Sequence, residues 1–267
     1  AWVNVDDPYA HVMMDAVDQK VADLHTYSMS DKTADLYAFD SRFTGKSSAF
    51  KVTYEGKTYQ FETRLAGRFN IYNTLGAIGA ALSEGISMET IAAAMKTFHS
   101  VPGRFELIDE GQSFTVVVDY AHTPDGLEKI LTTAQEITKG RILVVFGCGG
   151  DRDKMKRPIM GRIAARYADV AIVTSDNPRT EDPETIVKEV AAGVEEVKAE
   201  KPSLQVEVVV DRRSAIQKAI SLAKGDDIVL IAGKGHEDYQ ILKDKTIHFD
   251  DREEARKALK ESGAARF

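Results

Sequence analysis

The chain has 267 residues, a length that favours two domains. Hydrophobic residues make up 43% of it and charged residues 29%, as in ordinary globular proteins, and no apolar run approaches the roughly 20 residues of a membrane helix. The net charge of -7 argues against nucleic-acid or membrane partners, and the single cysteine, Cys148, excludes an intrachain disulfide and fits a reducing, cytoplasmic compartment.

The first hundred residues predict an α/β region that contains an antiparallel hairpin. Trp2 to Val5 has the pattern of a strand from the interior of a chain, and because Ala1 is not a methionine we expect the chain to be part of a longer protein. Phe39 to Thr63 alternates apolar and polar residues around turn signals at Thr44-Gly45 and Glu55-Gly56. This alternation is typical of antiparallel strands joined by tight turns.

Two helices are predicted after the hairpin region. One covers about Asn70 to Ser83, and the second begins after Ser87, a good capping residue. The proline and glycine in Val101-Pro102-Gly103 then indicate a joint between domains. We therefore expect a first domain over 1–100 and a second over 101–267.

The second domain has the pattern of a parallel sheet with crossover helices, because short apolar runs alternate with amphipathic segments. Runs rich in β-branched residues predict strands that are covered on both faces. These strands are Phe114 to Val118, Ile142 to Phe146, Val170 to Val173, Val206 to Val210 and Ile228 to Ala232. Helical faces lie between them at Leu127 to Ile137, Ile186 to Val197 and Ile216 to Ala223; Thr123-Pro124 predicts a helix start and Gly225 a helix stop.

Three charged loops follow successive strands of this predicted sheet. Ligands of open parallel sheets bind outside the carboxyl ends of the strands, so these loops are candidates for a binding site. The loops are Gly147 to Pro158, Asp176-Asn177-Pro178-Arg179 and Gly233-Lys234-Gly235-His236-Glu237. Each has a simpler interpretation: a tight strand-to-helix turn, a helix-capping turn and a surface turn, respectively.

The charges in these loops are of both signs. Arg152 and Arg179 suit a carboxylate, which a guanidinium binds with two parallel hydrogen bonds. Asp176 and Glu237 suit an ammonium group. The four side chains together predict a ligand that is zwitterionic at the end that this site binds.

A fourth segment, Asp119 to Asp125, lies between a predicted strand and its helix. Asp119 is a candidate for binding ribose hydroxyls, and Tyr120 or Pro124 for covering a flat base. The simpler interpretation, a capped helix start, explains Thr123 and Pro124 but not Asp119, Tyr120 or His122. We place His122 in no catalytic role, because a lone histidine is more often structural.

The chain contains no P-loop. Gly45-Lys46-Ser47 imitates the end of one, but the required first glycine is replaced by Asp40, and the flanking sequence is a hairpin pattern. We interpret this tripeptide as a turn.

Six motifs in the same order make the chain resemble the C-terminal part of Mur ligases, and among them the diaminopimelate-adding type. They are Gly67 to Asn73, Pro102 to Glu106, Asp119 to Asp125, Gly147 to Pro158, Asp176 to Arg179 and Gly233 to Glu237. The resemblance implies an α/β fold: the remainder of a central ATP-binding domain with an antiparallel hairpin region, then a Rossmann-like domain with a mostly parallel sheet that binds the incoming amino acid. It also implies a monomer.

The resemblance assigns an activity and site residues as well. The family uses ATP and Mg²⁺ to activate a carboxylate, here of UDP-N-acetylmuramoyl-L-alanyl-D-glutamate, as an acyl phosphate that the amine of meso-2,6-diaminopimelate attacks in peptidoglycan precursor synthesis. By motif, ATP would meet Asn70, Asn73, Arg104 and Asp119. Diaminopimelate would meet Arg152, Asp176, Asn177, Arg179, Gly233 and Glu237.

The family's P-loop, magnesium ligands and modified lysine would all precede Ala1 in family order. We therefore expect no metal site and no catalytic residue within this chain, and no ATP turnover by the chain alone. Within the superfamily, the alternatives are a lysine-adding ligase and, more remotely, a folylpolyglutamate synthetase; a non-catalytic amino-acid-binding module is a further alternative. Arg179 distinguishes the diaminopimelate-adding type from the lysine-adding type, since lysine ends only in an ammonium whereas diaminopimelate also ends in a carboxylate.

Overall fold

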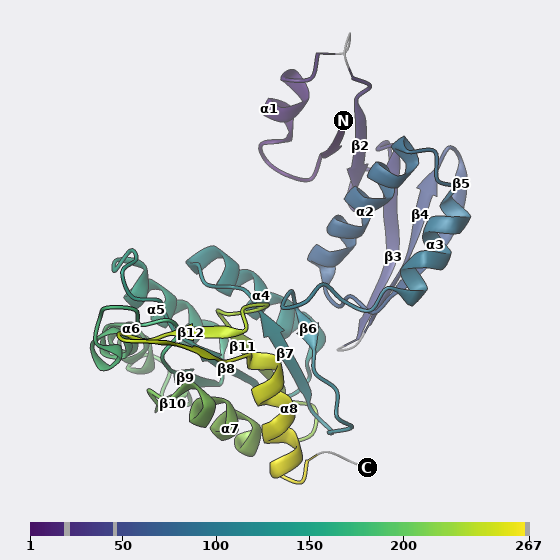
Figure 1. Ribbon diagram of the computed structural model, residues 1–267. Coiled ribbons are helices and arrows are strands. Elements are labelled where there is room, and N and C mark those ends of the chain that lie inside the picture. The colour runs from purple at the N-terminus through teal and green to yellow at the C-terminus, as the bar shows by residue number, and fades with distance from the viewer. Residues whose placement is uncertain (19–21, 45–46, 265–267) are drawn as a thin grey trace. The chain divides into compact units, whose positions relative to one another are not determined.

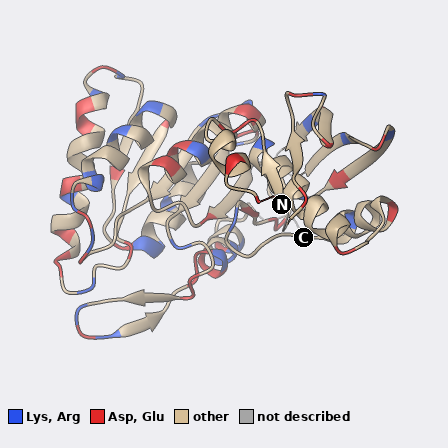
Figure 2. Cartoon of the chain, turned by 90° about the horizontal axis from the view of Figure 1, so that it is seen from above, with Lys and Arg blue, Asp and Glu red and all other residues tan. Residues whose placement is uncertain are grey.

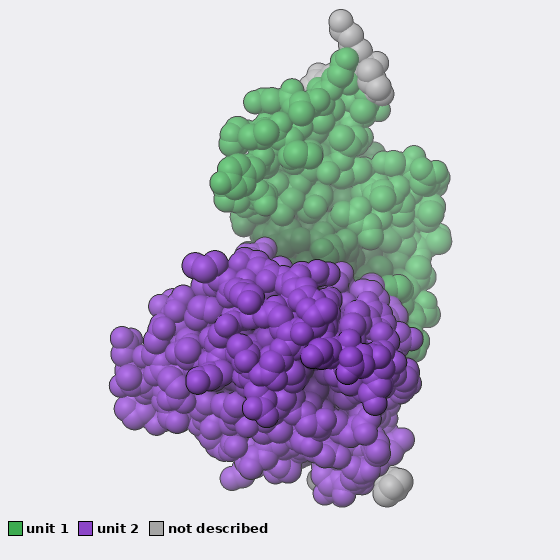
Figure 3. All heavy atoms as spheres, turned by 60° about the vertical axis from the view of Figure 1, so that its left-hand side comes forward, with its two compact units in different colours: residues 1–99 green, residues 100–267 purple. Residues whose placement is uncertain are grey.

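A computed structural model describes residues 1–18, 22–44 and 47–264. The chain divides into two compact units, Ala1–His99 and Ser100–Phe267 (Figure 1; Figure 3). Each unit has a main sheet and a hydrophobic core of its own. The chain is therefore α/β throughout, as the sequence predicts.

The first unit is built on a five-stranded sheet in the order β1-β2-β3-β4-β5. Its strands are β1 (Trp2–Asn4), β2 (His25–Ser28), β3 (Leu36–Thr44), β4 (Ser47–Tyr54) and β5 (Lys57–Thr63). The pairs from β1 to β3 are parallel, and those from β3 to β5 are antiparallel. The antiparallel pattern predicted over Phe39 to Thr63 is confirmed.

A two-residue turn joins β4 to β5. Glu55 and Gly56 both have positive φ, 48° and 73°. Two central residues of this kind match the twist of the flanking strands, and glycine adopts the conformation without a steric penalty. The predicted turn at Glu55-Gly56 is confirmed, whereas Gly45 and Lys46 of the other predicted turn lie outside the described residues.

Three helices accompany the first sheet: α1 (Ala10–Asp15), α2 (Arg68–Ser83) and α3 (Met88–Thr97). The helix predicted from Asn70 begins two residues earlier. Ser87 caps α3 as expected, because its hydroxyl accepts a hydrogen bond from the amide of Thr90 at 3.3 Å. Apolar residues of α2, including Leu75 and Ile78, share one buried core with Val52 and Phe61 of the sheet.

The second unit contains a six-stranded sheet in the order β10-β9-β8-β11-β7-β6. Its strands are β6 (Glu106–Leu107), β7 (Thr115–Asp119), β8 (Ile142–Phe146), β9 (Val170–Val173), β10 (Gln205–Val208) and β11 (Ile228–Ala232). All pairs are parallel except β6 with β7. A mostly parallel sheet was the expectation, and the bounds of three predicted strands agree residue for residue.

Two strands differ from their predictions. Strand β7 lies one residue further along the chain than Phe114 to Val118, and β10 differs in its bounds and its burial. The run Val206 to Val210 was expected to be covered on both faces, but β10 ends at Val208, which is 53% exposed. The reason is its place: β10 is an edge strand that pairs with β9 alone. A β-branched run therefore identified the strand correctly but not its burial.

Five helices complete the second unit: α4 (Pro124–Ile137), α5 (Lys156–Tyr167), α6 (Pro183–Lys198), α7 (Arg212–Leu222) and α8 (Asp251–Glu261). Thr123 caps α4, as predicted. The predicted stop at Gly225 is wrong, because α7 ends at Leu222 and Ala223 is already extended. Helix α8 and the hairpin β12 (Tyr239–Ile241) with β13 (Thr246–His248) were not predicted.

Basic and acidic residues are interspersed on the helices (Figure 2). Arg162 of α5 binds Glu196 of α6 at 2.8 Å, and Arg213 of α7 binds Glu254 of α8 at 2.8 Å. Such partly exposed pairs contribute little to stability but avoid large surfaces of one sign. No helix of the described segments is long and apolar enough to cross a membrane.

Helices α5 and α6 approach each other at two glycines. A Cβ added to Gly193 would lie 2.0 Å from the carbonyl oxygen of Pro158, and one added to Gly161 would lie 2.2 Å from that of Val190. Both contacts are with backbone, which cannot rotate away. Glycine is thus required here by packing, although it costs helix stability.

Replacing Gly193 with alanine is expected to destabilise the second unit by about 1–3 kcal/mol, the usual cost of overpacking. Thermal unfolding followed by circular dichroism measures the change. Gly76→Ala in α2 is the matched control, since the nearest atom to its added methyl is 3.7 Å away and alanine favours the helix. Equal unfolding temperatures for both variants and the wild type would contradict this, because they would show that α5 and α6 can move apart without loss of stability.

Candidate functional site

The candidate site is a cavity of about 440 Å³ at the carboxyl ends of β8, β9 and β11. Parallel strands bring their carboxyl ends to one edge of the sheet, so the three charged loops meet there. All six residues assigned to amino-acid binding line this single cavity: Arg152, Asp176, Asn177, Arg179, Gly233 and Glu237. Tyr120 and His122 of the fourth segment also line it.

Asp176 and Asn177 do not cap the following helix. The cap of α6 is Asp182, whose side chain accepts from the amide of Thr185 at 3.0 Å. Asn177 instead accepts from the amide of Ile241 at 2.9 Å and donates to Glu237 at 3.0 Å. The helix-capping interpretation of this loop is therefore wrong, and the Asn177 side chain joins it to the loop after β11.

Two arginines flank the glycine-rich loop. A Cβ added to Gly149 would lie 2.8 Å from Nη1 of Arg179 and 3.9 Å from Cγ of Arg152, so both side chains pass close to this glycine. Arg179 donates to the carbonyl of Gly150 at 2.9 Å, whereas Arg152 is exposed and donates to its neighbour Asp151 at 3.0 Å. Both arginines line the cavity and contribute positive charge to it.

A buried lysine organises the acidic part of the site. The Lys234 side chain is fully buried, and its Nζ lies 3.4 Å from Glu237, 3.6 Å from Asp176 and 3.2 Å from Oδ1 of Asn177. Oδ1 of Asp176 is buried and has no hydrogen-bond partner among the described residues. The interpretation of this loop as a surface turn is wrong for Lys234, because its side chain is buried. The sequence did not reveal this, since a lysine between two glycines carries no signal of burial.

Glu181, which was not predicted, holds the first two loops together. Its carboxylate accepts from the amide of Asp151 at 2.6 Å and from the fully buried guanidinium of Arg157 at 2.9 Å. The bonds from Arg157 and from this amide lower the pKa of the Glu181 carboxyl to about 2. Glu181 is therefore ionised at any physiological pH.

Cys148 lines the cavity but is not a nucleophile. The side chain is buried beside the sulfur of Met160, at 3.6 Å. Burial raises the pKa of the Cys148 thiol to about 11. A thiol that stays protonated attacks poorly, so Cys148 is not suited to nucleophilic chemistry in this cavity.

Tyr120 is the centre of an aromatic and cationic cluster. The guanidinium carbon of Arg104 lies 4.6 Å from the Tyr120 ring centroid, and the rings of His122 and His236 lie 4.6 and 5.1 Å away. Asp119 is buried, and its two oxygens accept from the amides of Phe105 and Ala121, each at 2.7 Å. Burial raises the Asp119 pKa, and these amides oppose the rise.

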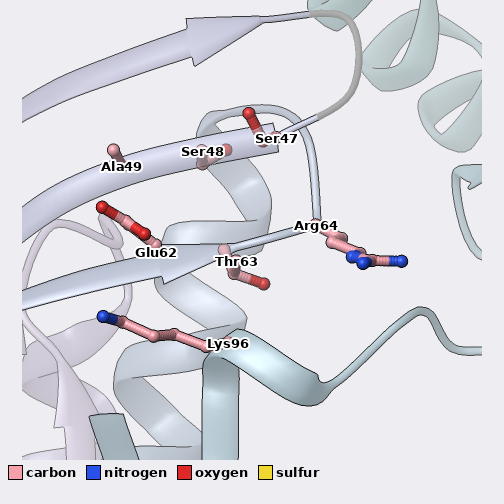
Figure 4. A pocket seen from close by; sticks show the side chains of 7 residues that line it. All are labelled: Ser47, Ser48, Ala49, Glu62, Thr63, Arg64 and Lys96. Carbon is pink, nitrogen blue, oxygen red and sulfur yellow. The ribbon is translucent and has the colours of Figure 1, made fainter. Parts of the chain in front are cut away.

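The two asparagines assigned to ATP lie on α2 in the first unit. Asn70 is buried and donates to the carbonyl of Ala66 at 2.8 Å, and exposed Asn73 donates to Oδ1 of Asn70 at 3.2 Å. The same unit has another hollow of about 410 Å³ between β4, β5 and Lys96 of α3 (Figure 4). None of the sequence-predicted site residues lines it.

No group of three or more histidine, cysteine, aspartate or glutamate side chains is arranged to hold a metal ion in residues 1–18, 22–44 and 47–264. The second unit thus offers carboxylate, ammonium and guanidinium groups around one cavity, with a stacking surface beside it. This combination can bind a zwitterionic ligand and a flat, anionic one.

Comparison with known proteins identifies the class. Residues 103–235 match the glutamate ligase domain of Mur ligases, and residues 1–81 match the Mur ligase middle domain. The chain belongs to the Mur ligase family.

Its relatives include UDP-N-acetylmuramoyl-L-alanyl-D-glutamate–2,6-diaminopimelate ligases. The chain is 47% identical over 262 residues to that of Clostridium botulinum and 48% identical over 267 residues to that of Geobacillus kaustophilus, covering 97% and 98% of this chain. A solved structure of such a ligase is similar with a TM-score of 0.71 and 35% identity, over 98% of this chain and 53% of that one. The chain spans 52% of the length of both curated relatives.

Proposed function

We propose that the chain is the amino-acid-binding part of an ATP-dependent ligase that adds meso-2,6-diaminopimelate to UDP-N-acetylmuramoyl-L-alanyl-D-glutamate in peptidoglycan precursor synthesis. Relatives with 47% and 48% identity carry the name of this reaction. The observation that carries the proposal is the cavity, in which two arginines and two carboxylates face one space.

The ligand class follows from the charges. One end of diaminopimelate is an α-amino acid with a carboxylate and an ammonium group. Arg152 and Arg179 suit the carboxylate, and Asp176 and Glu237 suit the ammonium. Oδ1 of Asp176 supports this assignment, since it is buried and accepts no hydrogen bond, with Lys234 Nζ 3.6 Å away, and a ligand that donates to it would satisfy it. L-Lysine lacks the distal carboxylate and would offer neither arginine an anionic partner, so we place the lysine-adding alternative second.

The role of this cavity in the reaction is positioning. ATP phosphorylates the carboxylate of the nucleotide substrate, and the amine of diaminopimelate displaces phosphate from the acyl phosphate. Holding the far end of the amino acid fixes the direction in which its reacting amine points, which raises the effective concentration of the nucleophile. The cavity suits this role because its charged side chains can hold a ligand, while its one thiol, Cys148, stays protonated and does not attack.

The nucleotide-binding part of the proposal rests on the Tyr120 cluster. An aromatic ring with a guanidinium 4.6 Å from its centroid suits a flat base next to phosphates. Arg104 and Asp119 of the second unit would contribute here. Asn70 and Asn73 of the first unit are assigned to ATP by their motif alone.

Isothermal titration calorimetry of the 267-residue chain tests the proposal. We expect meso-diaminopimelate to bind with at least about tenfold higher affinity than L-lysine, because one charge-assisted hydrogen bond is worth more than 1.4 kcal/mol. We expect no steady phosphate release from ATP in a coupled assay, since the sequence holds no P-loop. Equal affinity for the two amino acids would contradict the assignment of the substrate.

A further inference from the structure

Two loops of the site are fastened to each other by a compact set of hydrogen bonds, which we call the loop latch: Glu181 and Thr180 with Asp151, and Gly150 with Asn177. Glu181 accepts from the Asp151 amide at 2.6 Å, and the Thr180 hydroxyl donates to the Asp151 carboxylate at 2.7 Å. The amide of Gly150 donates to the carbonyl of Asn177 at 2.9 Å. The latch thus joins the loop after β8 to the loop after β9.

A buried cation, Arg157, binds the loop latch through Glu181. The guanidinium of Arg157 is fully buried and binds both oxygens of Glu181, at 2.9 and 3.1 Å. Its other acidic partner is Glu189 on α6, at 2.6 Å, and that side chain is 39% exposed. Glu181 alone of these two acids also contacts the glycine-rich loop. A lost contact of Glu181 would therefore loosen the loops, whereas a lost contact of Glu189 would not.

Each side of the latch carries one cavity arginine. Arg152 follows Asp151 directly, and Arg179 directly precedes Thr180. Asp151 and Arg179 both have a φ of 54°, a left-handed conformation that non-glycine residues keep only when surrounding contacts impose it. The latch supplies such contacts, so the spacing of the two guanidinium groups depends on it.

We propose that Glu181 is a positioning residue that sets substrate specificity: it fixes the spacing of Arg152 and Arg179 and so lets the site select an amino acid that ends in a second carboxylate. This inference rests on the proposed function. Glu181 acts through the two arginines and so on the carboxylate half of the ligand, because Asp176 and Glu237 have a cation of their own, Lys234, at 3.6 and 3.4 Å.

The test compares two ligands on three variants of the 267-residue chain. Calorimetry measures meso-diaminopimelate, and chemical-shift titration measures the weaker L-lysine. Glu181→Gln keeps the shape but removes the charge, and we expect it to lower diaminopimelate affinity about tenfold while lysine affinity is unchanged. Thr180→Val, which removes one bond of the latch, is expected to act in the same direction. Glu189→Gln makes the same chemical change on Arg157 without touching the latch and should retain the wild-type preference.

The outcomes separate the two proposals. A wild-type chain with no preference for diaminopimelate refutes the proposed function. A wild-type preference that Glu181→Gln and Thr180→Val both retain refutes the role of Glu181 alone. Equal losses of affinity for both ligands would also refute it, because they would mean that Glu181 only stabilises the fold. Thermal unfolding followed by circular dichroism identifies that case.

Discussion

Replacing Arg179 with alanine is expected to weaken the binding of meso-diaminopimelate by about 2–3 kcal/mol, which is roughly 30-fold to 150-fold in affinity. The side chain lines the cavity and is half-buried, so its bond to a carboxylate would be only partly screened by water. Calorimetry of the 267-residue chain measures the loss.

Two controls accompany this variant. Arg179→Lys keeps the charge without the planar pair of donors and should lose less affinity than alanine. L-Lysine as the ligand should bind both variants as it binds the wild type, because it has no distal carboxylate. An unchanged affinity of Arg179→Ala for diaminopimelate would remove the basis for distinguishing the two substrates.

Replacing Arg212 with methionine is expected to destabilise the second unit by about 3–5 kcal/mol, because it leaves the Asp251 carboxylate buried without a partner. Arg212 and Asp251 are both fully buried, and two bonds of 2.8 and 2.7 Å join them. Burial alone would lower the pKa of the Arg212 guanidinium, but Asp251 reverses this and raises it. Urea unfolding at neutral pH measures the difference.

The double variant Arg212→Met with Asp251→Leu tests whether the unpaired Asp251 carboxylate causes the loss of stability. It removes both charges, so it should recover most of the stability that the single variant loses. It should nevertheless bind diaminopimelate less well than the wild type, because Arg212 also donates to the carbonyl of Ala232 at 3.0 Å, just before Gly233. Equal instability of the single and double variants would show that the unpaired charge is not the cause.

Much of the fold was predictable because its strands are fully apolar. Ile142–Phe146, Val170–Val173 and Ile228–Ala232 are buried along their whole length, and an apolar run then coincides with the strand. Short or edge elements gave no such signal. The strands of the β12–β13 hairpin have three residues each, and β10 is half-buried at the edge of its sheet.

The members of the candidate site were also predictable, since strand ends determine which loops meet. Six residues assigned from three separate loops line one cavity. Their roles in binding diaminopimelate remain predictions. The same holds for Asn70, Asn73, Arg104 and Asp119 and for ATP.

The support beneath the site was not predictable. Arg157, Arg212 and Lys234 are fully buried cations, and each resembles an ordinary surface charge in the sequence. Burial of a cation depends on acidic partners that are distant along the chain: Glu181 and Glu189 for Arg157, and Asp251 for Arg212. Only the tertiary structure brings these partners together, so local sequence patterns do not reveal them.

The central claim is that one cavity of the second unit holds the zwitterionic end of diaminopimelate. A crystal structure of the chain with meso-diaminopimelate tests it most directly. We expect ligand density in the cavity, with a carboxylate against Arg152 and Arg179 and an ammonium group against Asp176 and Glu237. Density for the ligand at another place, or with its carboxylate turned toward Glu237, would contradict the claim.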